Sequence, residues 1–263
     1  MIIDFHTHMF PDKIAARTID FLSKKGGDMN PFTDGTWKGL KESTKQAGID
    51  HSIVLPIATR PGQFHTINEF AAHFQEGTLI SFGSLHPESE NYKEELRQIR
   101  DMGMKGIKLH PDYQDTYFND IRYKRIISYA TELELVISVH AGRDPKCPDN
   151  IHCTPAMAEE VLNEVEPEKL VLAHMGGNEL WSEVEERLVG RNVYFDTGVI
   201  LDRMPQEQFL RMVREHGADR IVFGTDSPWA DQKKFVEILK EMPLEEEERK
   251  QIFAGTAEKL LGL

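Results

Sequence analysis

Short runs of Val, Ile, Leu and Phe recur along the chain, and each is followed by a loop and a longer amphipathic stretch. Apolar runs of this length, bounded by turn residues, predict buried β-strands. Their starts are separated by about the length of one strand plus one crossover helix, which is typical of parallel strands. We expect strands at 2–8, 52–57, 79–85, 106–110, 135–140, 170–174, 193–196 and 221–226.

Apolar residues between these strands are spaced as on one face of a helix. Thr154 and Pro155 predict a helix start, because Thr caps a helix N-terminus well and Pro suits the first helical position. The first interval between strands is the longest and must hold an insertion. Helices are also expected at 11–25, near 37–47, at 88–101, 206–215 and 232–241, and within the C-terminal segment 244–263.

Eight alternating strand and helix units predict an α/β fold of the (β/α)8 barrel class, formed as one domain by residues 1–263. The competing α/β architecture is an open doubly wound sheet, which normally carries a glycine-rich phosphate loop after its first strand. The sequence contains neither G-x-G-x-x-G nor a P-loop, and its first expected strand ends in histidines. In a barrel, catalytic groups lie at the carboxyl ends of the strands.

Metal-ligand residue types occupy several of those ends. His6 and His8 are two positions apart in the first expected strand, so both side chains lie on the same face. His140, His174 and Asp226 end three further expected strands. A lone His-x-His is more often a hydrogen-bonded core pair, but five such residues at one rim predict a divalent metal site.

Imidazole and carboxylate ligands without a thiolate favour zinc, with manganese, iron or nickel as alternatives. One ion is expected, and two remain an alternative. A catalytic site keeps a position for water, whose pKa the ion lowers to about 7, so hydroxide is available at neutral pH. Asp226 would contact the metal and accept the proton of that water, while His174 would polarise a carbonyl or act as the base.

Several basic residues and one tryptophan lie in or just after the expected strands. Lys108 and His110 alternate on the inward face of the fourth strand. Lys108 would bind a substrate carboxylate, or become carboxylated and bridge two metals, or pair with a rim carboxylate. Arg143 and Arg60 would add positive charge at the same rim, which favours a polar or anionic substrate, and Trp229 would line the pocket.

A second metal site is the alternative interpretation of Cys147, His152 and Cys153, which follow the fifth strand. Their spacing matches no zinc-ribbon pattern, so a loop with incidental thiols is preferred.

Composition narrows the functional class. The chain of 263 residues has 31 Lys and Arg against 44 Asp and Glu, a net charge of −13. Such a charge disfavours nucleic acid and anionic membranes as partners and leaves a small molecule as the expected one. Two cysteines and the lack of an N-terminal signal or a membrane-length apolar run predict a cytoplasmic protein. A homodimer is the default expectation for a soluble oligomer.

Five motifs together resemble the amidohydrolase superfamily, in its amidohydrolase-related branch that includes aminocarboxymuconate-semialdehyde decarboxylase. They lie at 6–8, 106–111, 139–142, 172–177 and 223–229, and the resemblance extends to 255–257. It implies a metal-dependent TIM barrel whose ligands are His6, His8, His140 and Asp226. His174 would act beside the metal as the acid or base, or bind a second metal as in binuclear members, in some of which a carboxylated lysine such as Lys108 bridges both ions.

The resemblance leaves the reaction open, because the branch contains hydrolases of amides, esters and lactones as well as non-oxidative decarboxylases. Its decarboxylases tend to be longer, so this nearly minimal barrel favours a metal-dependent hydrolase, with decarboxylation at the same site as the alternative. A non-catalytic binding barrel is disfavoured, because it would have no chemical reason to keep the whole ligand set.

Overall fold

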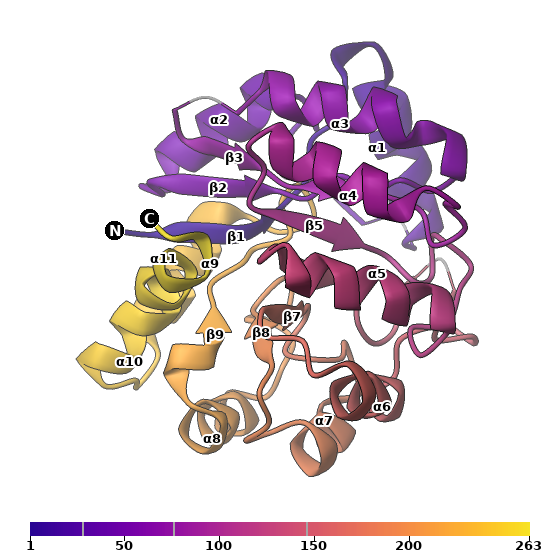
Figure 1. The fold of residues 1–263 in the computed structure, drawn as a ribbon. Coiled ribbons are helices and arrows are strands. Elements are labelled where there is room, and N and C mark those ends of the chain that lie inside the picture. Colours follow the sequence, from indigo (N-terminus) through magenta and orange to yellow (C-terminus); the bar gives the residue numbers. More distant parts are fainter. Residues whose placement is uncertain (28, 76, 146) are drawn as a thin grey trace. The chain divides into compact units, whose positions relative to one another are not determined.

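The strands follow the order expected from the sequence. The computed structural model describes residues 1–27, 29–75, 77–145 and 147–263 (Figure 1). Its strands are β1 (Ile3–Thr7), β2 (His51–Val54), β3 (Leu79–Ser81), β4 (Gly83–Ser84), β5 (Gly106–Leu109), β6 (Val136–Val139), β7 (Leu170–Leu172), β8 (Tyr194–Asp196) and β9 (Ile221–Val222). Each expected strand has a counterpart, and the third is divided at Phe82 into β3 and β4.

Several strands end earlier than expected. His174 and Asp226 were expected to be the last residues of strands, yet both lie beyond them, with φ of 59° and 66°. These values belong to the left-handed region, which few non-glycine residues adopt and which often marks functional sites. The backbone therefore turns sharply at both candidate residues.

Helices separate the strands along the chain. They are α1 (Asp12–Lys25), α2 (Trp37–Gln46), α3 (Phe64–His73), α4 (Tyr92–Asp101), α5 (Ile121–Glu132), α6 (Pro155–Val165), α7 (Trp181–Arg187), α8 (Gln206–His216), α9 (Gln232–Glu241), α10 (Glu246–Lys250) and α11 (Thr256–Leu261). Two short 3-10 helices, η1 (Pro61–Gln63) and η2 (Ala218–Arg220), and one π-helical turn, η3 (Gln251–Gly255), complete them.

The expected helix boundaries hold with one shift. The predicted cap of α6 is confirmed, since the Thr154 side chain accepts a hydrogen bond from the backbone N–H of Met157. In contrast, α4 begins at Tyr92 and not at residue 88, because a turn in which Ser89 N donates to His86 O (3.0 Å) comes first. None of the helices in the described part of the chain combines the length and apolar character that a bilayer crossing requires.

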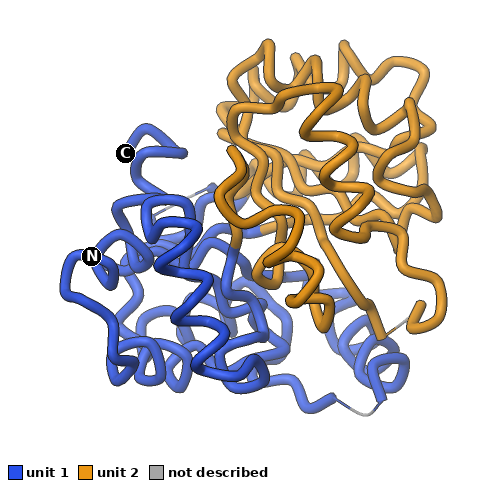
Figure 2. The backbone as a smooth tube through the Cα atoms, turned by 90° about the horizontal axis from the view of Figure 1, so that it is seen from below, with its two compact units in different colours: residues 1–54, 74–80, 196–263 blue, residues 55–73, 81–195 orange. Residues whose placement is uncertain are grey.

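The backbone divides into two compact units (Figure 2). In unit 1, residues 1–54, 74–80 and 196–263, β1 and β2 are parallel neighbours. β1 also bonds the segment that follows β9, because Phe5 N donates to Phe223 O and Asp226 N donates to His6 O, both at 2.7 Å. These bonds align the histidine-bearing strand with the segment that carries Asp226.

Unit 2 contains residues 55–73 and 81–195, with a parallel run of neighbouring strands from β4 to β7 and most of β8. In its register Lys108 lies opposite Ser138, and Val139 lies opposite Leu172. β5, β6 and β7 are buried at every position, as expected for parallel strands covered on both faces.

A buried carboxylate joins β1 to the segment after β9 in unit 1. Asp4 is fully buried and accepts hydrogen bonds from the Thr225 backbone N–H (2.9 Å), the Thr225 hydroxyl (2.6 Å) and the Gln232 amide (2.8 Å). Burial raises the pKa of Asp4 to about 6, and the bonds from Thr225 and Gln232 partly oppose that rise. Asp4 therefore holds together the two segments that carry His6 and Asp226.

Replacing Asp4 by Asn should weaken this junction. The amide keeps the volume but presents N–H groups to donors, so a buried donor loses its acceptor at a cost of about 1–3 kcal/mol. Urea unfolding of the full chain measures the difference. The matched control is Asp20→Asn on α1, which removes an exposed carboxylate paired with Lys24 and should change stability by less than about 0.5 kcal/mol. Equal unfolding free energies of the two variants would contradict this role of Asp4.

Candidate metal centre

Three predicted ligands converge in unit 1. The Nε2 atoms of His6 and His8 are 3.2 Å apart, and Oδ1 of Asp226 lies 3.4 Å from the first and 3.0 Å from the second. We call this set the His6–His8–Asp226 triangle. His6 lies in β1, His8 directly follows the end of that strand, and the turn after β9 supplies the carboxylate.

A second carboxylate orients His6. Oδ2 of Asp196, the last residue of β8, lies 2.8 Å from His6 Nδ1, and both side chains are buried. Because a carboxylate accepts hydrogen bonds, this contact places the imidazole proton on Nδ1 and leaves the lone pair of Nε2 directed toward His8 and Asp226. Carboxylates in this position typically fix metal-ligating histidines and raise their basicity.

Close packing of the backbone sets the position of Asp226. A Cβ atom added to Gly224 would lie 2.9 Å from the Cβ of His6, so a residue with a side chain would push β1 away. Asp226 itself is buried, and the half-buried Trp229 donates its backbone N–H to Asp226 O (2.9 Å). Gly224 therefore allows the approach that brings the carboxylate to the two histidines.

The donor set of the triangle fits a divalent cation. Two imidazole nitrogens and a carboxylate oxygen lie within 3.4 Å of one another, and these are donor types that divalent transition metals coordinate. His6 is buried and His8 partly buried, so water screens the charges weakly. The geometry thus suits zinc and equally the other oxygen- and nitrogen-binding ions.

Unit 2 carries the other two rim histidines. His174 Nε2 and His140 Nδ1 are 3.1 Å apart, and both residues are buried. The ring of His110 stacks on His140 with centroids 4.2 Å apart and planes at 5°, and Tyr113 stacks on His110 at 3.9 Å. Nε2 of His140 lies 3.9 Å from Oδ2 of Asp144. This cluster fixes both imidazoles, while the predicted coordination of a metal by His140 stays a prediction.

The predicted substrate-binding cations differ in environment. Lys108 is fully buried in β5 of unit 2. Arg143 is exposed, donates to Pro148 O (2.8 Å) and lies 3.7 Å from Glu179, and Arg60 is exposed at the start of η1. The buried lysine is therefore held by the strand, whereas the two arginines lie on loops.

Sequence reasoning missed the carboxylates beside the histidines. Asp196 is the last residue of an expected strand, and that position could have identified it. Asp144 comes four residues after His140, and Asp112 comes two residues after His110, so both follow strand ends as well. Burial raises the pKa of Asp112, and its hydrogen bond with His152 opposes that rise.

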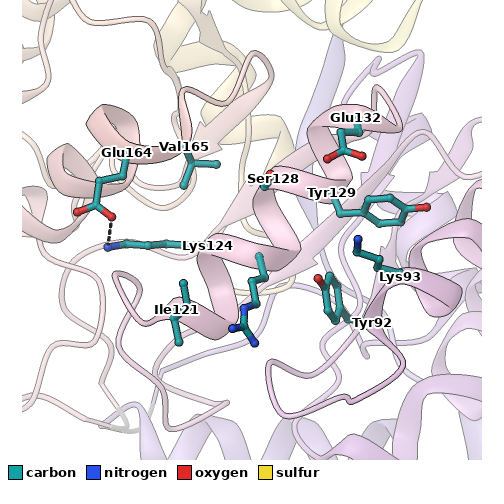
Figure 3. A pocket seen from close by; sticks show the side chains of 10 residues that line it. Tyr92, Lys93, Ile121, Lys124, Ser128, Tyr129, Glu132, Glu164 and Val165 are labelled. Atoms are coloured by element: carbon teal, nitrogen blue, oxygen red, sulfur yellow. Dashed lines mark hydrogen bonds and ion pairs between the residues drawn. The ribbon is translucent and has the colours of Figure 1, made fainter.

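A surface hollow of about 340 Å³ lies elsewhere in unit 2 (Figure 3). Residues of α4, α5 and the end of α6 line it, among them Tyr92, Tyr129 and Lys124. The Lys124 ammonium pairs with Glu160 (2.6 Å) and Glu164 (2.8 Å), which raises the pKa of Lys124. Among its described lining residues there is none of the predicted metal or substrate ligands, so we do not assign the reaction to it.

Comparison with known proteins identifies the fold. The Amidohydro_2 family model, described as amidohydrolase, matches residues 3–263. A search of curated proteins found no match. Among solved structures, an uncharacterised TIM-barrel protein from Bordetella bronchiseptica has a TM-score of 0.78 at 19% identity, with 99% of this chain and 98% of that one covered. The fold is therefore the predicted (β/α)8 barrel.

Two further similar structures are decarboxylases. A dihydroxybenzoic acid decarboxylase from Polaromonas, with bound manganese and the inhibitor 2-nitroresorcinol, has a TM-score of 0.78 at 16% identity, covering 100% of this chain and 97% of that one. A 5-carboxyvanillate decarboxylase from Sphingomonas paucimobilis has a TM-score of 0.70 at 13% identity, covering 100% and 99%.

Replacing Asp196 by Asn should lower metal affinity without removing a ligand. The amide no longer holds the proton of His6 on Nδ1 by charge, and loss of such a partner typically weakens metal binding by about 10–100-fold. Competition between the protein and a chromogenic chelator for zinc measures the change. Asp202→Asn serves as the control, because Asp202 pairs with Lys234 at the surface of the same unit. An unchanged zinc affinity in Asp196→Asn would show that Asp196 does not support the centre.

Proposed function

Because the chain belongs to the amidohydrolase family, we propose that it is a metal-dependent enzyme that removes carbon dioxide, without oxidation, from a small aromatic or unsaturated carboxylic acid. The observation that carries the proposal is the full-length similarity to decarboxylases of dihydroxybenzoate and carboxyvanillate. The His6–His8–Asp226 triangle supports it, because it supplies the donor set that a divalent cation needs.

Chain length no longer favours hydrolysis. The expectation of a hydrolase depended on decarboxylases of this branch being longer, yet this chain covers 97% of the Polaromonas decarboxylase and 99% of the Sphingomonas decarboxylase. Both reactions remain within the chemistry of the family. We prefer decarboxylation to hydrolysis because the similar structures include decarboxylases. Hydrolysis of an amide, ester or lactone is the competing outcome of the experiment below.

We assign the metal to His6, His8 and Asp226, with His140 as the fourth ligand that the family resemblance implies. When bound, the cation acts as a Lewis acid that holds and polarises the acidic oxygens of the substrate. Manganese is the preferred ion for this proposal because the Polaromonas decarboxylase contains it, and imidazole and carboxylate ligands accept manganese as well as zinc.

The protein's own residues handle the proton and the substrate. In decarboxylation the bond between the ring carbon and the carboxylate breaks, the electron pair stays on the ring carbon, and that carbon takes up one proton. We assign this proton transfer to Asp226 and His174. Lys108 would neutralise an anionic group of the substrate.

The remaining predicted contacts are retained as substrate-binding positions, namely His110, Arg60, Trp229 and Arg143. The net charge of −13 supports a small-molecule substrate over nucleic acid or a membrane, and a homodimer remains the proposed assembly.

The test measures product and isotope incorporation together. Chelator-treated protein is reloaded with manganese or zinc and incubated in D2O with 2,6-dihydroxybenzoate, 5-carboxyvanillate, and a panel of lactones and amides. We expect carbon dioxide from a carboxylic acid and one deuterium at the vacated ring carbon. The double variant His6→Asn/His8→Asn should lose one bound equivalent of the metal together with the turnover, while His65→Asn, at an exposed position of α3, should keep both.

Release of carbon dioxide by the chelator-treated protein at the full rate would contradict the metal assignment. Turnover of lactones or amides with no carbon dioxide from any acid would replace the decarboxylase proposal by hydrolysis.

A further inference from the structure

Unit 2 contains a second group of metal-ligand side chains on the loops after β5 and β6. Asp112, Cys147 and His152 each offer one donor atom, and these atoms lie within 4.8 Å of one another. The sequence interpretation preferred incidental thiols here and did not include Asp112. The structure brings Asp112 into contact with the histidine and leaves Cys153 fully buried.

The histidine and the carboxylate are already fixed to one another. Oδ1 of Asp112 lies 2.9 Å from His152 Nδ1 and accepts the His152 backbone N–H at 3.3 Å. The Cys147 thiol lies 3.9 Å from the backbone oxygen of Asp112, within hydrogen-bond distance for sulfur. Asp112 and His152 are buried, while Cys147 is half-buried, so an ion could reach the thiol from solvent.

An independent observation points to a ligand. Asp112 is 2% exposed, and its Oδ2 atom has no hydrogen-bond donor among the described residues. Nε2 of His140 lies 3.7 Å away, which is too far for a hydrogen bond. A buried carboxylate oxygen without a donor costs free energy, and a bound cation removes that cost.

The chemistry of the donors differs from that of the first centre. A thiolate, an imidazole and a carboxylate together select zinc-class ions, whereas the His6–His8–Asp226 triangle offers nitrogen and oxygen alone. Donor atoms on one tetrahedral zinc ion lie about 3.5 Å apart, so small side-chain rotations bring these three into range. Asp115 is exposed, and its Oδ1 lies 3.4 Å from His152 Nε2, so it offers a second carboxylate as a fourth donor.

We propose that Asp112, Cys147 and His152 form a second, thiolate-containing site for a zinc-class divalent cation. On binding, the thiol loses its proton to solvent and the sulfur coordinates the ion. The backbone bond from Gly142 N to Cys153 O (2.9 Å) closes the loop after β6, and the cation would tie this loop to the one after β5. Its role is therefore to fix two loops that follow neighbouring strands of unit 2.

Cobalt binding tests the site apart from the first centre. The chelator-treated, reduced full chain carrying His6→Asn/His8→Asn is titrated with Co²⁺, and both bound equivalents and the near-ultraviolet sulfur-to-cobalt charge-transfer band are measured. We expect one equivalent with the band, and the loss of both on adding Cys147→Ser. Cys153→Ala is the matched thiol control and should keep both.

Titration of chains with intact His6 and His8 gives a second readout. There Cys147→Ser should bind one equivalent of Co²⁺ fewer than the parent chain, with an unchanged circular dichroism spectrum. No charge-transfer band in the folded parent chain, or a band that survives Cys147→Ser, would overturn the proposal. Because the band is read in a background without His6 and His8, failure of this site is distinguishable from failure of the proposed function.

Discussion

The buried carboxylate of Asp4 is the constraint from which the candidate centre follows. It gathers donors from Thr225 and Gln232, 221 and 228 residues away in sequence, and so pins β1 against the segment after β9. The backbone bond from Asp226 to His6 then sets the register of the two segments, and Gly224 provides the space for it. With that junction in place, a two-residue alternation in β1 and a left-handed turn at Asp226 suffice to assemble the triangle.

The Asp196 carboxylate beside the triangle orients His6 and also fixes which of its ring nitrogens carries the proton. Asp196 holds the proton of His6 on the nitrogen that faces away from His8, so that the lone pair of His6 Nε2 is directed toward His8 and Asp226. This orientation suits coordination of a cation by His6. In unit 2 the buried Asp112 carboxylate likewise contacts a histidine, His152, and the Cys147 thiol offers a further donor atom within 4.8 Å. The first donor set thus offers nitrogen and oxygen atoms, and the second adds a sulfur atom. A buried aspartate orients a histidine in each, Asp196 in the first and Asp112 in the second.

The sequence predicts those features that depend on local pattern. Alternation along β1 placed His6 and His8 on one face, and the end of the eighth expected strand identified Asp226; the structure confirms that the three converge. The Thr154 cap of α6 was predicted for the same reason, since capping needs a few neighbouring residues. Asp4 was missed because its role depends on pairing with residues 221 and 228 positions away, which no local pattern encodes. Asp196 was also missed, although it ends an expected strand, the same signal that identified Asp226. The reaction was also beyond reach, because one ligand set can serve both hydrolysis and decarboxylation.

Binding of a cation by the His6–His8–Asp226 triangle can be observed by anomalous diffraction from a zinc-loaded crystal, recorded on both sides of the zinc absorption edge. We expect an anomalous peak about 2.0–2.2 Å from Nε2 of His6, from Nε2 of His8 and from an Asp226 oxygen. A fully loaded crystal with no anomalous density between these three side chains would contradict it.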